Sequence, residues 1–342
     1  MAVRVGINGF GRIGRSFTRA LLARGAGTGV ELVAINDPMG DNETMAFLLK
    51  HDSVGGPLAH AVQATGDGFS IDGRDIPRLG VMDPGEIPWS GHDVDVVIES
   101  TGLFTAREKA AAHLGGSVKR VVISAPSNDA DATICMGVND AVFDASKDSV
   151  ISNASCTTNC LAPLAKVLND RFGIEQGLMT TVHAYTSDQS LVDLAKVTRS
   201  GKPDLRRMRA AALSIIPSST GAARAIGLVL PELKGKLDGT ALRVPTPTGS
   251  ITDLSANLAK EATVSDINAA FAEAANDPSY RGVLEYCTEP LVSADIVGNP
   301  ASCIFSAEDT MANGRMVKVL GWYDNEWGYS NRLVDLIAFV GE

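Results

Sequence analysis

The chain opens with a pattern typical of a βαβ unit. Apolar, mostly β-branched residues at 2–8 (AVRVGIN) predict a strand, and apolar residues then recur at helical spacing from Arg12 until Gly25. A second apolar run at 30–37 (VELVAIND) predicts another strand. Because two such strands must lie parallel with the helix as their crossover, residues 1–155 are predicted to form an open, doubly wound Rossmann sheet. Further strand runs at 93–99, 120–124 and 149–152, with a helix-like stretch at 106–113, continue the alternation.

The pattern changes after residue 172. Longer strand-like runs at 177–184, 240–244, 250–258, 303–305 and 316–322 are mixed with isolated helices. This arrangement predicts a second α+β domain, residues 156–324, on a mixed or antiparallel sheet. Apolar positions at helical spacing predict a last helix within 325–342, which returns to complete the first domain.

Composition and charge narrow the class of protein. Hydrophobic residues make up 45% of the 342 residues, which favours a globular chain over a disordered one. The 30 Lys and Arg residues against 40 Asp and Glu residues leave a net charge of −10, so nucleic acid is not expected as a primary partner. We expect no signal peptide and no membrane segment. Five cysteines are too few for a disulfide framework and lack the spacing of metal ligands, which favours reduced thiols, a cytoplasmic location and no metal.

The first candidate site is the glycine turn GFGRIG, with Gly9, Gly11 and Gly14 between a strand and a helix. Such a turn lets backbone N–H groups approach a pyrophosphate at the positive end of a helix. Asp37 ends the second strand, where an acidic residue typically binds an adenosine ribose. An ordinary strand–helix turn and a solvated carboxylate are the alternatives, but the two signals together favour dinucleotide binding.

The second candidate is Cys156 in the polar segment SNASCTTNC, which follows a strand and begins an apolar helix. Free N–H groups and the helix dipole in a first turn favour the thiolate, so the pattern predicts a lowered pKa and a nucleophile rather than an inert buried thiol. Pro163 opposes the carbonyl of Asn159, and we expect a kink or a loosened first turn there. Cys160 begins the apolar stretch and is interpreted as structural.

A reacting thiol needs a proton carrier, and His183 is the best candidate among the five histidines. It ends the apolar run GLMTTVHAYT, at the kind of strand end where α/β proteins place functional groups. The spacing alone makes it only the best of five. The other four are predicted to be solvated or packed: His51, His60, His92 and His113.

In these motifs the chain resembles the phosphorylating glyceraldehyde-3-phosphate dehydrogenases over its whole length. The most specific of the matching segments are NASCTTNCLAP and WYDNEWGYSNR. The resemblance implies oxidation of glyceraldehyde 3-phosphate with NAD and inorganic phosphate, through a hemithioacetal and a thioester on Cys156. It makes His183 the base. The backbone N–H of Cys156 is expected to donate to the substrate oxygen as that oxygen gains charge. A homotetramer is implied in the same way.

The resemblance also assigns the binding residues. Thr186 and Arg243 match the pocket for the substrate's phosphate. The pocket for inorganic phosphate is matched by Ser155, Thr157, Arg207, Thr220 and Gly221. The cofactor residues are Gly9, Gly11, Arg12, Ile13, Gly14, Asp37, Met82, Ser124 and Asn325, with Tyr329 near the nicotinamide. Met82 stands where the family often has an arginine, which removes one partner for a 2′-phosphate.

One loop departs from the family pattern, since the segment between Leu194 and Asp204 is about six residues longer, in a type of segment that tolerates insertion. Ala195 replaces a proline common in NAD-preferring members. Lys196, Arg199 and Lys202 add positive charge that either is solvated or meets a 2′-phosphate. Asp37 favours NAD over NADP. The alternatives left open are an erythrose-4-phosphate dehydrogenase, an NADP-preferring biosynthetic form, a Cys–His hydrolase and a catalytically idle binding protein.

Overall fold

A computed structural model describes residues 2–198 and 201–342, so Arg199 of the extended loop lies outside the described residues. The chain divides into two compact units, one of residues up to Ser155 together with Tyr329–Glu342, the other of Cys156–Gly328. The predicted class, a Rossmann domain with a second domain on a mixed sheet, is confirmed. No helix among the described residues is long and apolar enough to cross a membrane.

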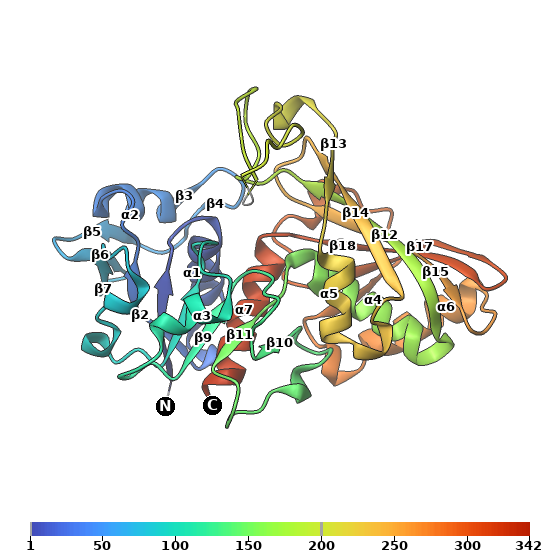
Figure 1. The fold of residues 1–342 in the computed structure, drawn as a ribbon, viewed down its shortest axis with the longest axis horizontal. Coiled ribbons are helices and arrows are strands. Elements are labelled where there is room, and N and C mark those ends of the chain that lie inside the picture. The colour runs from blue at the N-terminus through green and yellow to red at the C-terminus, as the bar shows by residue number, and fades with distance from the viewer. Residues whose placement is uncertain (1, 199–200) are drawn as a thin grey trace. The chain divides into compact units, whose positions relative to one another are not determined.

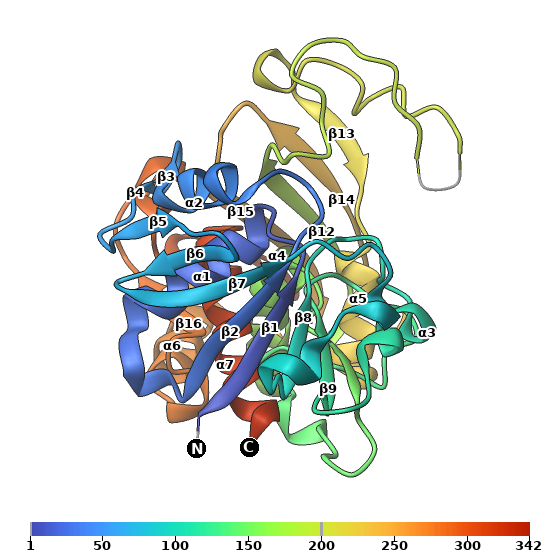
Figure 2. The ribbon, with the colours of Figure 1, turned by 90° about the vertical axis from the view of Figure 1, so that its left-hand side faces the viewer.

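The first unit is built on a nine-stranded sheet in the order β10-β11-β9-β8-β1-β2-β7-β6-β5. Figure 2 shows the part from β9 to β5. Its parallel part contains β1 (Val3–Asn8), β2 (Val30–Asn36), β8 (Val96–Glu99), β9 (Arg120–Ile123), β10 (Ala132–Thr133) and β11 (Val150–Ser152). An antiparallel edge is formed by β5 (Val62–Ala64), β6 (Gly68–Ile71) and β7 (Arg74–Leu79), of which β7 pairs in parallel with β2. The predicted strand at 93–99 begins only at Val96, after a short 3-10 helix that ends at His92.

Hydrophobic burial explains why the central strands are parallel. Val5, Ile7, Ile98 and Val122 are fully buried, as expected for strands covered on both faces. Helix α1 (Arg12–Arg24) follows β1, and α2 (Asn42–Lys50) is capped by the side chain of Asp41. The remaining elements of this unit are β3 (His51–Asp52), β4 (Gly56–Pro57) and α3 (Arg107–Ala110), which continues into a 3-10 turn, Ala111–His113. The carboxyl ends of β1, β2 and β8 therefore meet at one edge of the sheet.

The second unit has a seven-stranded sheet in the order β13-β14-β12-β15-β18-β17-β16. The strands are β12 (Ile174–Ala184), β13 (Ile216–Ser219), β14 (Leu237–Val244), β15 (Ser250–Leu258), β16 (Leu284–Cys287), β17 (Cys303–Asn313) and β18 (Met316–Tyr323). Only β12–β14 and β16–β17 pair in parallel, so the sheet is mixed. Helices α4 (Cys156–Phe172), α5 (Ala222–Val229) and α6 (Val264–Ala275) pack against it (Figure 1). Because α4 contacts both α5 and α6, all three lie on one face.

Two local predictions have clear outcomes. The last helix, α7 (Trp327–Gly341), is present, and Leu333, Leu336, Ile337 and Val340 are fully buried. From Tyr329 onward it belongs to the first unit, where a side chain at Gly341 would collide with Val3. In the extended loop, the N–H of Thr198 donates to the carbonyl of Lys202 over 2.7 Å, and Val197 and Pro203 form an isolated antiparallel bridge.

Candidate active site

The candidate nucleophile and base lie together in the second unit. Cys156 is the first residue of α4 and His183 is the penultimate residue of β12. The Sγ atom of Cys156 lies 3.5 Å from Nε2 of His183. The helix start and the strand end that were predicted separately therefore meet within contact distance, although 27 residues separate them.

The hydrogen bonds of His183 select one tautomer. Its Nδ1 lies 2.7 Å from the carbonyl oxygen of Ala184, which can only accept, and 2.9 Å from Nη1 of Arg243, which can only donate. We assign the proton of the neutral ring to Nδ1, because the contact with Ala184 is the shorter and Nη1 of Arg243 has other acceptors at Ala184 and Thr186. The lone pair of Nε2 then faces the thiol of Cys156. Arg243 reaches the same place, with Nη1 2.9 Å from Nδ1 and 3.2 Å from the Ala184 oxygen. The imidazole is thus oriented to accept a proton from sulfur.

Burial decides the charge of this pair. Desolvation raises the pKa of Cys156 to about 11, against the opposing effects of the Arg243 charge and of hydrogen bonds from Thr157. Burial and the Arg243 charge lower the pKa of His183 to about 4. The predicted lowering of the thiol pKa is therefore wrong for the free protein, because the desolvation penalty exceeds what the helix start and the arginine return. The resting pair is a neutral thiol beside a neutral imidazole.

The predicted ligands of the substrate's phosphate, Thr186 and Arg243, are in contact. Nη1 of Arg243 donates to Oγ1 of Thr186 over 3.1 Å. The Thr186 hydroxyl in turn donates to Oδ1 of Asp188, whose Oδ2 lies 3.2 Å from Nη1 of Arg207. A single carboxylate, Asp188, thereby connects residues assigned to the two different phosphate pockets.

The other predicted phosphate ligands occupy helix starts. Thr157 lies in the first turn of α4, and its hydroxyl shares a 2.9 Å hydrogen bond with the buried phenol of Tyr323. Oγ1 of Thr220 accepts from the N–H of Ala222 over 3.1 Å, and Gly221 directly precedes α5. Ser155 is the last residue before α4. Thr220 and Gly221 thus form local hydrogen bonds at the start of α5, where the carbonyl of Gly221 accepts from the N–H of Ala225 over 2.8 Å.

The glycine turn in the first unit fits a dinucleotide. Gly9 has a φ of 95°, and a Cβ there would lie 2.6 Å from the nitrogen of Thr101; a Cβ at Gly14 would lie 2.4 Å from the carbonyl oxygen of Gly9. Protein packing thus requires both glycines. A Cβ at Gly11 would meet nothing within 4 Å. Protein packing does not explain the second glycine, and the open space there would admit a phosphate close to the backbone.

Asp37 ties the second strand to this turn. Its Oδ2 accepts from the N–H of Phe10 over 2.6 Å and its Oδ1 accepts from the N–H of Met39 over 2.8 Å. Each oxygen retains a second lone pair, which suits a ribose hydroxyl. Arg12, at the start of α1 beside Ile13, pairs with Asp52. The turn and the acidic residue, predicted from separate signals, are in direct contact.

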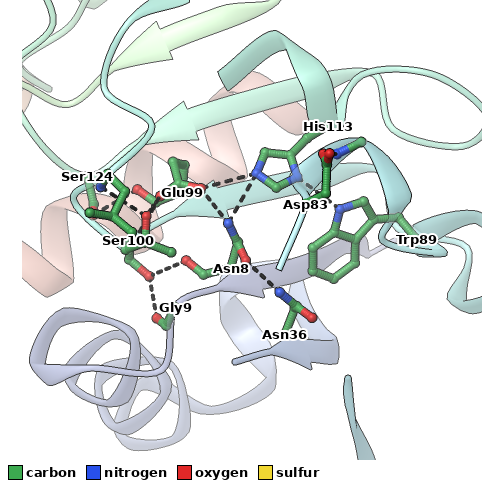
Figure 3. Close-up of polar contacts among 12 residues, drawn as sticks. Asn8, Gly9, Asn36, Asp83, Trp89, Glu99, Ser100, His113 and Ser124 are labelled. Atoms are coloured by element: carbon green, nitrogen blue, oxygen red, sulfur yellow. Dashed lines mark hydrogen bonds and ion pairs between the residues drawn. The ribbon is translucent and has the colours of Figure 1, made fainter. Parts of the chain in front are cut away.

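The remaining cofactor candidates divide between the units. Ser124 follows β9, and its hydroxyl donates to the carbonyl of Glu99 over 3.1 Å at the carboxyl edge of the sheet (Figure 3). Met82 lies on an exposed loop of the same unit. Asn325 belongs to the second unit, where its Oδ1 accepts from Ser250 over 2.8 Å, which leaves the amide nitrogen as its free donor face. Tyr329 donates to the carbonyl of Ala154 over 3.1 Å.

Comparison with known proteins decides the family. Residues 3–107 match the model of the glyceraldehyde 3-phosphate dehydrogenase NAD-binding domain, and residues 155–325 match that of the C-terminal domain. The chain belongs to the glyceraldehyde-3-phosphate dehydrogenase family. It is 56% identical to a glyceraldehyde-3-phosphate dehydrogenase of Streptomyces coelicolor and 58% identical to one of Mycobacterium avium, over all of this chain and 99% of each relative. A Mycolicibacterium smegmatis relative of the same name is 57% identical, with the same coverage.

Family membership confirms the resemblance inferred from the motifs, and the presence of an NAD-binding domain confirms NAD as the cofactor. Four residues near the predicted sites were not singled out by the sequence: Glu99, His113, Asp188 and Tyr323. Glu99 ends a central parallel strand, a position that is itself a signal in this fold class. Asp188 and Tyr323 carry no such signal, because only the folded chain brings them beside residues distant in sequence.

Proposed function

We propose that this chain catalyses the phosphorylating oxidation of D-glyceraldehyde 3-phosphate to 1,3-bisphosphoglycerate with NAD, with Cys156 as nucleophile. The names of its relatives support the substrate, and the NAD-binding domain supports the cofactor. The observation that carries this proposal is the 3.5 Å contact between the Cys156 sulfur and Nε2 of His183, the ring nitrogen that we assign as unprotonated. This is the geometry that an activated thiol nucleophile requires.

The first step is addition of the thiol to the aldehyde. A bond forms between Sγ and the carbonyl carbon while the thiol proton moves to Nε2 of His183. The carbonyl electrons go to oxygen, which receives a proton from the imidazolium to give a hemithioacetal. The pKa values of about 11 for Cys156 and about 4 for His183 mean that an ion pair is costly in the free protein, so proton transfer and addition are coupled. The backbone N–H of Cys156 is a second donor to the oxygen.

The second half of the reaction releases an acyl phosphate. NAD, when bound, supplies the hydride acceptor for oxidation of the hemithioacetal to a thioester. Nε2 of His183 takes the hydroxyl proton as the carbonyl reforms. A phosphate oxygen then attacks the thioester carbon, the C–S bond breaks, and the sulfur leaves as a thiolate beside the positive charge of Arg243.

We assign two anion-binding pockets to these reaction steps. Thr186 and Arg243 hold the phosphate of the substrate, since their contact places a hydroxyl and a guanidinium side by side. The pocket for inorganic phosphate is assigned to Ser155, Thr157, Arg207, Thr220 and Gly221. An acidic chain needs such locally placed donors to bind a dianion.

We assign dinucleotide binding to Gly9, Gly11, Arg12, Ile13, Gly14, Asp37, Met82 and Ser124, and the family resemblance assigns Asn325 to the carboxamide. Asp37 selects NAD, because a carboxylate that accepts ribose hydroxyls repels a 2′-phosphate. We also propose a cytoplasmic homotetramer, as the family resemblance implies. Light scattering of the purified protein, with an expected mass four times that of the chain, tests the assembly.

The deciding experiment is the initial rate of reduced-cofactor formation from glyceraldehyde 3-phosphate and inorganic phosphate, with NAD and NADP in parallel. We expect phosphate-dependent turnover with NAD that disappears in Cys156→Ser. Erythrose 4-phosphate is the control substrate. Faster turnover of erythrose 4-phosphate, turnover independent of phosphate, or a preference for NADP would each contradict the corresponding part of the proposal.

A further inference from the structure

A buried carboxylate lies at the carboxyl edge of the first unit's sheet and takes no part in the reaction described above. The side chains of Glu99 and His113 are both fully buried and pair over 3.1 Å between Oε2 and Nε2 (Figure 3). Oε2 also accepts from Nδ2 of Asn8 over 2.6 Å. Oε1 accepts from the N–H of Thr101 over 2.9 Å and from its hydroxyl. Every partner of this carboxylate is therefore a donor.

The position of the His113 proton follows from Trp89. The indole Nε1 of Trp89 lies 3.2 Å from Nδ1 of His113, and an indole N–H can only donate, so Nδ1 is an acceptor. The proton of the neutral ring then resides on Nε2 and points at Glu99. The orientation of the Asn8 amide is fixed as well. Its Oδ1 accepts from Nδ2 of Asn36 over 2.8 Å, so its own Nδ2 must face the carboxylate of Glu99. Trp89 thus locks the tautomer that Glu99 needs.

This network reaches the dinucleotide turn through the segment after Glu99. The main chain at Ser100 and Thr101 lies against the α-carbon of Gly9, so closely that no side chain fits there. The hydroxyl of Ser100 donates to the carbonyl of Gly9 over 2.6 Å, and that carbonyl abuts Gly14. Since Glu99 holds both the N–H and the hydroxyl of Thr101, it determines where this segment lies.

We propose that Glu99 and His113 are positioning residues for dinucleotide binding, with the carboxylate holding the 100–101 backbone against Gly9 and the Trp89-locked imidazole orienting the carboxylate. This inference rests on the proposed role of the glycine turn. Neither side chain reaches the surface, so neither touches the cofactor; they act by keeping the turn in the shape that meets a pyrophosphate.

The first test is the affinity of Glu99→Gln for NAD, measured by calorimetry. The NH₂ group of the new glutamine must take the place of one carboxylate oxygen. In one orientation its hydrogens face the donors of Thr101, and in the other they face the donors of Asn8 and His113. We expect the Kd for NAD to rise about tenfold, as for other buried groups left without a partner. Glu31→Gln removes a partly exposed carboxylate from β2 of the same sheet and is the matched control. Its Kd is expected to be unchanged.

The tautomer lock makes a sharper prediction. In Trp89→Phe the Nδ1 atom loses its donor, so the ring can move its proton to Nδ1 and accept at Nε2. Nε2 of His113 then becomes an acceptor. It can accept from the amide introduced by Glu99→Gln and from Nδ2 of Asn8, which lies 3.3 Å away. We expect the double variant Trp89→Phe/Glu99→Gln to bind NAD more tightly than Glu99→Gln alone, with a coupling of about threefold to tenfold.

The outcomes separate this inference from the function on which it rests. Equal Kd values for Glu99→Gln and Glu31→Gln, or lowered thermal stability with an unchanged Kd, overturn it and show that the network only supports the fold.

If Glu99→Gln does not fold, His113→Gln and His113→Leu replace it. The former keeps one donor and one acceptor at similar spacing and is expected to bind NAD normally, whereas the latter is expected to bind weakly. Equal affinities of these two overturn the inference, and wild-type protein that does not bind NAD refutes the proposed function itself.

Discussion

Two buried histidines, one in each unit, have opposite relations to their surroundings. His113 in the first unit has both ring nitrogens taken by protein partners, Trp89 on one side and Glu99 on the other. In His183 of the second unit, Nδ1 contacts the carbonyl of Ala184 and Nη1 of Arg243, and Nε2 faces the sulfur of Cys156. A ring with both nitrogens satisfied holds position, whereas a ring with one lone pair directed at a reactive atom can move a proton.

The two rings also differ in the charge that lies next to them. His113 faces a carboxylate, which favours a donor at Nε2. Desolvation, and after it the nearby charge of Arg243, lowers the pKa of His183 and keeps the ring a neutral base. Burial is nearly the same in both cases. We therefore propose that the neighbouring charge separates the positioning role of His113 from the catalytic role of His183, and a sequence does not reveal that neighbour.

The largest expected effect separates the two rings directly. His183→Gln removes the proton acceptor, and we expect kcat to fall by about 10²- to 10⁴-fold. His113→Gln retains a donor and an acceptor, and its kcat is expected to stay within about twofold of wild type at saturating NAD. Steady-state kinetics of both variants measures this. Comparable losses of kcat would abolish the distinction.

The next effect concerns Arg243. Arg243→Gln is expected to raise the KM for glyceraldehyde 3-phosphate by about 10- to 100-fold, because a charged partner of the phosphate is lost. Arg243 also lowers the pKa of both Cys156 and His183. Its removal should therefore shift the pH profile of Cys156 alkylation by iodoacetamide to higher pH. Arg209→Gln, at an exposed arginine paired with Asp193, is the control, and an equal shift there would exclude a local charge effect.

Acid stability tests the burial of His183. Its pKa is about 4 in the folded protein against an ordinary value of 6.5, so between these values the unfolded chain binds a proton that the folded chain does not. Stability from this source is present above pH 6.5 and is lost as the pH falls toward 4, by up to about 1.4 kcal/mol per pH unit. Urea unfolding at several pH values should show a shallower loss for His183→Gln. An identical slope would mean that His183 is protonated in the folded state.

The smallest effect is expected at Asp188. Thr186 has one hydroxyl hydrogen and gives it to Asp188, so a phosphate oxygen, which can only accept, must displace that carboxylate. Asp188→Asn removes a competing negative charge from a partly exposed site, and we expect the KM for glyceraldehyde 3-phosphate to fall about twofold to fivefold. A rise in KM would show instead that Asp188 serves mainly to orient Arg207.

The sequence-based predictions succeeded where the interacting residues lie close together in the chain. The first βαβ unit, the helix beginning at Cys156 and the last helix all follow from local periodicity and strand-end residues, and all are present. The strand predicted at 303–305 runs on to Asn313, because the consecutive polar residues Glu308, Asp309 and Thr310, at a break in the register with β18, interrupt the apolar pattern. The extent of edge elements depends on which neighbours pair with them.

By itself, the sequence determined the fold class, the family, the NAD-binding turn and the identity of Cys156 and His183 as the candidate pair, since periodicity, turn chemistry and motifs are properties of consecutive residues. Tertiary structure alone decided the charge state of that pair, the bridge through Asp188 and the Trp89–His113–Glu99 network. Desolvation and Coulomb interaction depend on distances between side chains that lie far apart in the chain, and only folding sets those distances.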